Sequence, residues 1–348
     1  MHASLVLILP LTFLVTALLT GAVRRLALAR GLLDVPNRRS SHSRPTPRGG
    51  GLAVLVTCTA VVGVTALTGQ VSRPLATALA AGGTLVGAVG FFDDCFSLRP
   101  ATRLVAQLGA ALVAVTVVGS LAVVTLGERA VPLGMVSSIV ISVLGMLWVL
   151  NLFNFMDGID GIAASEAIFV ALAGAWLSHA NTDPLGIGVV AWVFAAACAG
   201  FLVWNWPPAK IFLGDVGSGY LGFVIALLAL ASARREPNNL WIWLILGGAF
   251  FSDATVTLVW RLARGETVHQ PHRTHAYQWL ALGWQSHARV TVALWALNLL
   301  VLLPGAALAR SFPRYAFALC CLTLTGLAVL VWRLGAGRQA PASRAGSP

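Results

Sequence analysis

Long apolar runs separated by short polar segments make up most of the chain. A run of about 18 or more apolar residues is long enough to cross the hydrocarbon core of a bilayer as a helix. Breaks at charged residues, proline and glycine predict eleven such spans, at residues 4–22, 50–69, 75–92, 102–124, 134–151, 162–178, 186–204, 211–231, 239–261, 288–308 and 315–333. Because a backbone inside a bilayer must satisfy its own hydrogen bonds, we predict an all-α integral membrane protein.

The composition supports this fold class. Of the 348 residues, 58% are hydrophobic and 10% are charged, and the mean hydropathy is +0.83, whereas about a quarter of the residues in soluble proteins are charged. We predict one membrane domain over residues 1–334, followed by a disordered tail, 335–348. The first apolar run has no basic residue before it and no small-residue cleavage pattern after it, so we interpret it as an uncleaved span.

Basic residues are unevenly distributed between the two sets of predicted loops. One set, together with the C-terminal tail, carries 17 of the 23 Lys and Arg residues. Because basic loops are retained in the cytoplasm, this bias predicts an outside N-terminus and a cytoplasmic C-terminus. It also accounts for the net charge of +11 without a nucleic-acid partner, which we do not expect.

Five polar motifs fall in the loops assigned to the cytoplasm, although they played no part in that assignment. They are SSHSRPTPRGGG (40–51), FFDDCFSLRP (91–100), NLFNFMDGIDG (151–161), KIFLGDVGSG (210–219) and HQPHRTHAYQ (269–278). The opposite loops, such as TGQVSRP and GERAVP, are short and plain. The pattern therefore predicts a functional site built from several loops on one face of the membrane.

Two motifs supply most of the acidic and amide groups. Asp93 and Asp94 are adjacent carboxylates at a span end, where they repel each other unless a divalent cation or phosphate chemistry compensates them; an acidic helix end is the alternative. A second set recurs at a spacing of three, which on a helix would align it along one face and offer oxygen ligands suited to Mg²⁺, or else form a helix cap and turn. Its members are Asn151, Asn154, Asp157 and Asp160.

The other three motifs add one acid and several basic groups. Asp215 lies in a glycine-flanked turn, which by itself is common. His272, Arg273 and His275 suit a diphosphate through charge-assisted hydrogen bonds, although ordinary basic-loop charge would also explain them. The serine- and glycine-rich motif with Ser41 and Arg48 can bind an anion through its backbone amides, or anchor the chain at lipid head groups. Together the five motifs indicate metal-assisted phosphoryl transfer between a water-soluble and a lipid phosphate.

These motifs closely resemble those of the polyprenyl-phosphate N-acetylhexosamine-1-phosphate transferases (glycosyltransferase family 4). The matching segments are DD at 93–94, NxxNxxDGIDG at 151–161, FLGDVGS at 212–218 and HRTHAYQ at 272–278. The resemblance implies an enzyme of the bacterial inner membrane, with its active site facing the cytoplasm, in which undecaprenyl phosphate attacks the β-phosphate of a UDP-N-acetylhexosamine and UMP is released. Direct attack and a route through a covalent aspartyl intermediate are both compatible with these residues. It implies Mg²⁺ as the cofactor, with Mn²⁺ as an alternative, and is compatible with a homodimer.

The motifs and the resemblance together predict three groups of site residues. Asp93, with Asp94 beside it, is expected to be catalytic, by deprotonating or orienting the lipid phosphate. Asp215 and Asn154 are the expected metal ligands. The residues expected to bind the substrates or shape their pocket are Asn151, Asp157, Asp160, His272, Arg273, His275, Ser41 and Arg48.

The branch of the family is predicted from one loop. HRTHAYQ differs from the histidine-rich form of the peptidoglycan branch, and looks closer to O-antigen-initiating enzymes that use UDP-GlcNAc or a 6-deoxy relative. Many relatives carry a third acid where this chain has Ser97, so no role is assigned there. Phospho-MurNAc-pentapeptide transferase activity is the alternative within the family.

Two alternatives lie outside the family. An ion-coupled transporter would place its acids near the bilayer midplane and between related halves, which are not visible. Here the acids lie at span ends, and Asp253, the one clearly intramembrane acid, could equally be a structural partner between helices. A CDP-alcohol phosphotransferase would need several Asp residues packed around DG and AR pairs in one motif, and no such run occurs.

Overall fold

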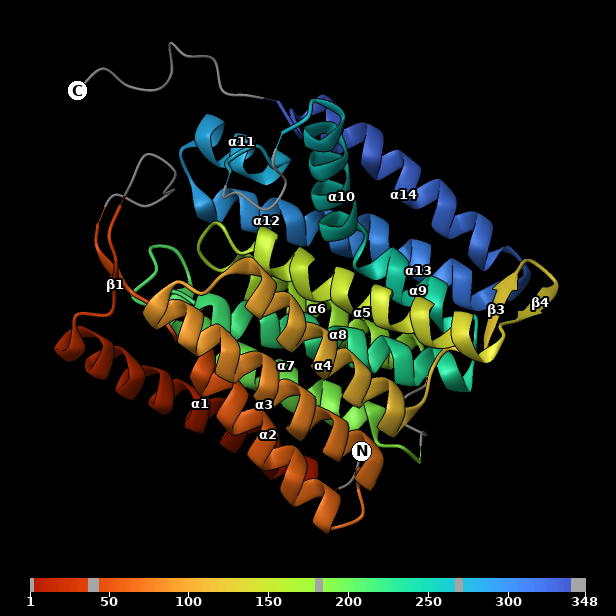
Figure 1. Cartoon of the computed structure of the whole chain (residues 1–348), viewed down its shortest axis with the longest axis horizontal. Coiled ribbons are helices and arrows are strands. Elements are labelled where there is room, and N and C mark those ends of the chain that lie inside the picture. Colours follow the sequence, from red (N-terminus) through yellow and green to blue (C-terminus); the bar gives the residue numbers. More distant parts are fainter. Residues whose placement is uncertain (1–2, 37–43, 179–183, 267–271, 339–348) are drawn as a thin grey trace.

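The computed structural model describes residues 3–36, 44–178, 184–266 and 272–338, which form a bundle of helices (Figure 1). The α-helices are α1 (Ala3–Arg30), α2 (Gly51–Leu67), α3 (Arg73–Phe96), α4 (Pro100–Val118), α5 (Met135–Met156), α6 (Ile162–Leu177), α7 (Ile187–Asn205), α8 (Gly214–Arg235), α9 (Asn239–Leu246), α10 (Gly248–Ala263), α11 (Ala276–Trp284), α12 (His287–Leu297), α13 (Leu303–Ser311) and α14 (Ala316–Arg333). A π-helical turn, Asn298–Leu302, joins α12 to α13, and a 3₁₀ turn, Pro313–Tyr315, precedes α14.

Two antiparallel hairpins complete the described secondary structure. β1 (Leu33–Asp34) pairs with β2 (Thr46–Pro47), and β3 (Val123–Leu126) pairs with β4 (Arg129–Pro132). The two hairpins lie at opposite ends of the bundle (Figure 1). The second hairpin corrects the predicted span 102–124, because α4 ends at Val118 and the chain continues into β3.

α8 is the central helix of the bundle. It is apolar around its whole circumference and nearly all residues of its most apolar stretch are buried, as expected for a helix surrounded by other helices. It packs against α3 and α5 along most of its length. Because α8 begins at Gly214, Asp215 lies on the first turn of this central helix, at one end of the molecule.

All eleven predicted apolar runs contain helices, but not all as expected. In the described part of the chain, eight helical segments are long and apolar enough to cross a membrane, while α2 and α6 are shorter apolar helices of 17 and 16 residues. The run 239–261 is bent by 72° between α9 and α10, and would be a ninth span if the pair is counted as one. The protein is thus a multi-pass α-helical membrane protein.

The predicted grouping of the loops matches the contacts between them. At one end, the amides of Gly50 and Gly51 bind the carbonyls of Phe212 and Leu213. At the other end, the Arg234 side chain binds the Ser120 carbonyl and the loop 69–72 meets residues 185–186. The described ends of α1 and α14 nearest the termini lie at opposite ends of the bundle (Figure 1). The described parts of the five motifs therefore lie at one end.

The predicted tail differs from the structure in its first residues. Gly335–Arg338 form turns after α14, and Ala336 is buried. Residues 339–348 lie outside the described residues.

Candidate functional site

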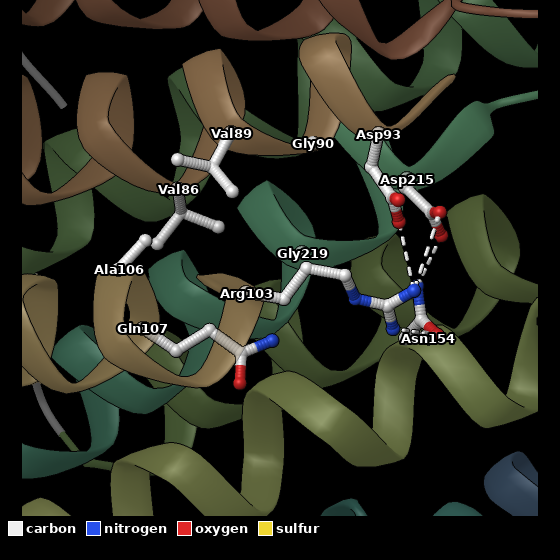
Figure 2. A pocket seen from close by; sticks show the side chains of 10 residues that line it. All are labelled: Val86, Val89, Gly90, Asp93, Arg103, Ala106, Gln107, Asn154, Asp215 and Gly219. Carbon is white, nitrogen blue, oxygen red and sulfur yellow. Dashed lines mark hydrogen bonds and ion pairs between the residues drawn. The ribbon is translucent and has the colours of Figure 1, made fainter. Parts of the chain in front are cut away.

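An arginine side chain lies at the centre of the polar cluster (Figure 2). Arg103, on the first turns of α4, places Nη1 2.7 Å from Asp93 Oδ2 on α3 and 3.7 Å from Asp215 Oδ2 on α8. Its Nη2 is 3.5 Å from Asn154 Oδ1 on α5. Four helices therefore each contribute one polar side chain to a single point at their ends.

Asn154 and Asp215, the two predicted metal ligands, are direct neighbours. Asn154 Nδ2 donates to Asp215 Oδ1 at 2.5 Å and to Ser218 Oγ at 3.0 Å. Asn154 lies on the last turn of α5, and Asp215 on the first turn of α8. The crossing of α5 and α8 brings together residues that are 61 positions apart.

The two adjacent acids of α3 have different environments. Both oxygens of Asp93 are used, because Oδ1 accepts from the Leu98 amide at 2.6 Å and Oδ2 binds Arg103. Asp94 accepts from the amides of Asp215 and Val216 at 3.1 and 3.3 Å. It thus caps the N-terminus of α8, where a negative charge is favourable.

A glycine permits the contact between Asp94 and α8. Gly214 has a φ of +75°, and a Cβ there would lie 2.5 Å from Asp94 Oδ2. The GD pair of the motif therefore has a packing function: glycine turns the backbone, and the next residue presents its carboxylate.

A small cavity opens beside this cluster. It measures about 20 Å³ and is lined by both polar and apolar side chains (Figure 2), among them Asp93, Arg103, Gln107, Asn154 and Asp215. A volume of this size holds about one water molecule or small ion.

The oxygen atoms at the cavity fit a magnesium ion that is bound partly by the protein and partly by a substrate. Among the described residues, no three His, Cys, Asp or Glu side chains form a protein-only metal cage. Mg²⁺, however, is commonly held by one or two protein oxygens together with water and substrate phosphates. Asp215 and Asn154 supply a carboxylate and an amide oxygen at the cavity wall. The Arg103 guanidinium lies beside the carboxylates of Asp93 and Asp215, so a positive charge is already stabilised at this position.

Asp157 extends the negative charge away from the helix ends. It follows the last residue of α5 and is partly exposed at the surface. Its carboxyl group is nevertheless surrounded by protein atoms, and this desolvation, followed by the charges of Asp215, Asp94 and Asp160, raises its pKa to about 8. A bound cation would reverse that effect.

The expected alignment of four residues along one helix face is wrong, because α5 ends at Met156. Asn151 lies one turn before Asn154 but turns toward α4, where its Nδ2 donates to Gln107 Oε1 at 3.0 Å. Asp160 lies beyond the helix, where its Oδ2 accepts from the Ala209 amide at 3.0 Å and is 3.3 Å from His287 Nδ1. Asp160 therefore joins three loops, and its predicted contact with substrate stays a prediction.

The histidine loop, residues 272–275, packs onto the loop that follows α5. The rings of His272 and His275 stack at 5.0 Å, and each lies 6.5 Å from the Phe155 ring. Tyr277 Oη donates to the Phe155 carbonyl at 3.1 Å. A Cβ at Gly158 would lie 2.1 Å from this hydroxyl, so glycine is required there. The motif at 151–161 and the histidine loop, more than 110 residues apart in the chain, thus pack against each other.

The members of the histidine loop have different exposure. His275 is buried, with Nδ1 3.3 Å from Asp253 Oδ1, so it supports the loop from inside. His272 and Arg273 are partly exposed, and burial lowers the pKa of the Arg273 guanidinium. The two partly exposed side chains are therefore the ones available to a ligand.

The glycine-rich motif before α2 does not present free amides at the two positions that begin this helix. Its Gly50 and Gly51 amides donate to the carbonyls of Phe212 and Leu213, each at 2.9 Å. The expected anion site on these amides is therefore wrong, and the motif instead supports the segment before Asp215. Arg48 remains close enough to influence Asp94 electrostatically. Ser41 lies outside the described residues.

Two residues of the cluster were not predicted as site residues. Arg103 was counted only among basic loop residues, yet a single arginine on a largely apolar helix, ten positions after Asp93, was a usable signal. Gln107 lies one helical turn later on the same largely apolar helix, and its polar side chain there was a usable signal as well. Asp253, for which a structural role between helices was the alternative to ion transport, contacts His275 and so has a structural role.

Comparison with known proteins identifies similar chains. The family model for glycosyl transferase family 4 matches residues 76–233. Decaprenyl-phosphate N-acetylglucosaminephosphotransferase of Mycobacterium tuberculosis is 30% identical over 81% of this chain and 77% of its own length. A probable undecaprenyl-phosphate N-acetylglucosaminyl 1-phosphate transferase of Bacillus subtilis is 28% identical, over 82% and 80% respectively. Phospho-N-acetylmuramoyl-pentapeptide-transferase of Mycolicibacterium vanbaalenii is 31% identical, over 84% and 93%.

Proposed function

This chain belongs to glycosyl transferase family 4 and is a phosphoglycosyltransferase that acts on a polyprenyl phosphate, and we propose that it transfers N-acetylglucosamine 1-phosphate, or a 6-deoxy relative, from the UDP-sugar to undecaprenyl phosphate. An oxygen of the lipid phosphate attacks the β-phosphorus of the donor. The bond from the β-phosphorus to the bridging oxygen breaks, and UMP leaves with that oxygen. The product is the lipid diphosphate sugar.

The meeting of Asp93, Arg103, Asn154 and Asp215 at the ends of four apolar helices carries this proposal. A lipid phosphate at a membrane surface and a nucleotide diphosphate in water can meet only at such a boundary. Arg103 is placed to bind a phosphate oxygen, and Asp93, whose two oxygens are already occupied, orients it. The catalytic contribution is then mainly positioning and charge stabilisation, as is usual for phosphoryl transfer.

We propose Mg²⁺ as the cofactor, held by Asp215 and Asn154, with Mn²⁺ as a substitute. When bound, the ion would neutralise the donor diphosphate and favour departure of UMP. Asp157 lies on the side of the histidine loop and contributes negative charge that favours a cation. His272 and Arg273, on the same side as Asp157, then contact the diphosphate or sugar.

The choice of donor rests on the histidine loop. Relatives named for N-acetylglucosamine and for N-acetylmuramoyl-pentapeptide have similar identities to this chain, so overall identity does not discriminate between donors. The HRTHAYQ loop favours a donor without peptide, and its buried His275 leaves only His272 and Arg273 for contact. Placement in O-antigen synthesis, in the bacterial inner membrane with a cytoplasmic site, stays a prediction.

The test is release of UMP by purified protein in detergent. Undecaprenyl phosphate and Mg²⁺ are supplied with UDP-GlcNAc, a UDP-6-deoxy-N-acetylhexosamine or UDP-MurNAc-pentapeptide. We expect release that requires lipid, metal and one of the first two donors. The exposed Glu128→Gln change in the β3–β4 turn, at the far end of the molecule, serves as the matched control.

Three results would decide between the candidates. Turnover only with the pentapeptide donor would replace the proposed donor by the alternative. Release without added lipid would indicate hydrolysis of the donor. Folded protein that releases no UMP with any of the three donors would contradict the proposed function.

A further inference from the structure

Asp253 is a buried acid outside the phosphate site whose role is not explained by the reaction. It lies on α10, and its residue is 3% exposed. Oδ1 accepts from the Ala276 amide at 2.9 Å, and Oδ2 accepts from the Tyr277 amide at 3.0 Å. These amides begin α11 and have no partner within that helix. Asp253 therefore caps α11 from a neighbouring helix and stabilises the residues that follow the histidine loop.

The last described residues of the chain contact the same loop from outside. The Gly337 amide donates to the Thr274 carbonyl at 2.7 Å, and the Arg264 side chain donates to the Gly337 carbonyl. Ala336 is 1% exposed and packs in one small cluster with Ala276 and Val331. The C-terminal turn, Gly335–Arg338, is therefore part of the folded domain.

The geometry of this turn depends on glycine. Gly337 has a φ of +76°, and a Cβ there would lie 2.6 Å from Trp260 Cβ on α10. Both the backbone conformation and the approach to α10 exclude a side chain. A sequence that reads as a tail thus contains a constrained contact with the histidine loop.

We infer that Asp253 and the C-terminal turn together hold the histidine loop in its ligand-binding position, so that the turn contributes to affinity for the nucleotide sugar. Their bonds reach Thr274, Ala276 and Tyr277, on both sides of His275. A loop that is ordered before binding loses less conformational entropy on binding. Asp253 is a positioning residue in this account, which rests on the proposed function for the identity of the ligand.

The test combines hydrogen exchange with kinetics. The variants are a chain that stops after Leu334, Gly337→Ala and Asp253→Asn; a chain that stops after Arg338 is the matched control. Exchange of the Ala276 and Tyr277 amides is measured without substrate. UMP release then gives KM for the UDP-sugar, KM for undecaprenyl phosphate and kcat. Gly337→Ala keeps the whole chain and tests the turn if the shortened protein folds poorly.

We expect the three variants to exchange these amides at least tenfold faster, while the control exchanges like the full chain. We also expect KM for the UDP-sugar to rise about three- to tenfold, the effect of one or two lost hydrogen bonds, with KM for the lipid unchanged. Unchanged exchange in all three variants would overturn the inference. An equal loss in every kinetic constant would also overturn it, because that indicates general destabilisation.

The exchange measurement separates this inference from the proposed function. If the full chain releases no UMP with any donor, the proposed function fails, while exchange of the two amides still shows whether Asp253 and the C-terminal turn hold the histidine loop. If UMP is released and exchange does not respond to the variants, only the inference about the loop fails.

Discussion

Arg103 Nη1 lies 2.7 Å from Asp93 Oδ2 and 3.7 Å from Asp215 Oδ2, and so joins an acid at the end of α3 to an acid at the start of α8. The guanidinium balances two carboxylates that would otherwise repel each other at the end of an apolar bundle. It also leaves Asp215 only partly neutralised, which favours a further cation.

Asp215→Asn should reduce kcat by at least about 100-fold at any practical Mg²⁺ concentration, because an amide is a weaker ligand and carries no charge to hold the ion. UMP release over a range of Mg²⁺ concentrations measures this, with Glu128→Gln as the control. Recovery of activity at high Mg²⁺ would show weakened metal binding only, and activity near that of the unchanged protein would remove Asp215 from the metal site.

Arg103→Gln should raise KM for undecaprenyl phosphate or lower kcat, with a combined loss of about 10- to 100-fold, as expected for one charge-assisted hydrogen bond. Arg103→Lys keeps the charge but not the forked geometry, so it should recover part of the loss. Arg129→Gln, on the distant β4 strand, is the control. Equal kinetics for Arg103→Gln and the control would contradict a phosphate-binding role.

Asp94→Ala should lower the free energy of unfolding by about 1–3 kcal/mol, since the part-buried Asp215 amide and the buried Val216 amide at the start of α8 lose their acceptor. Asp94→Asn retains one acceptor oxygen and should lose less. Thermal unfolding in detergent compares the two. If both variants unfold like the unchanged protein, the cap contributes nothing and Asp94 is free for a chemical role.

Asp157 should make the metal-free protein less stable as pH rises. Its folded-state pKa is raised from 3.8 to about 8, so between these values the folded state binds more protons than the unfolded state, and stability falls with increasing pH. We expect the unfolding temperature to drop by a few degrees between pH 6.5 and 8.5 without Mg²⁺. Asp157→Asn should reduce this drop. An identical pH dependence in the variant would show that the Asp157 carboxyl group does not titrate between pH 6.5 and 8.5.

His272→Ala and His275→Ala should separate binding from folding. His272 is partly exposed, so its loss should raise KM for the UDP-sugar without changing the unfolding temperature. His275 is buried between aromatic rings and Asp253, so its loss should lower the unfolding temperature. Kinetics and thermal unfolding on both variants provide the comparison. Unchanged kinetics in His272→Ala would show that this side chain does not contact the substrate and is only part of the general basic character of the loop.

Much of the architecture could be predicted because the apolar runs are long. Every predicted run contains a helix, and the distribution of Arg and Lys correctly grouped the loops that contact one another. The runs did not reveal the bend between α9 and α10, the helix α11 or the hairpins, since these short elements depend on neighbours rather than on length. The packed turn at Gly335–Arg338 was missed for the same reason, because its composition is that of a tail.

The sequence by itself determined which residues could meet at the site, because the hydrophobic effect confines polar groups to the ends of apolar helices. Only the tertiary structure decided which partners each residue contacts there. It turned Asp94 into a helix cap, directed Asp160 toward His287, occupied the Gly50 and Gly51 amides and placed Arg103 among the acids. Hydrogen bonds and charge pairs act over a few ångströms, so the packing of distant helices, and not spacing along the chain, sets their partners.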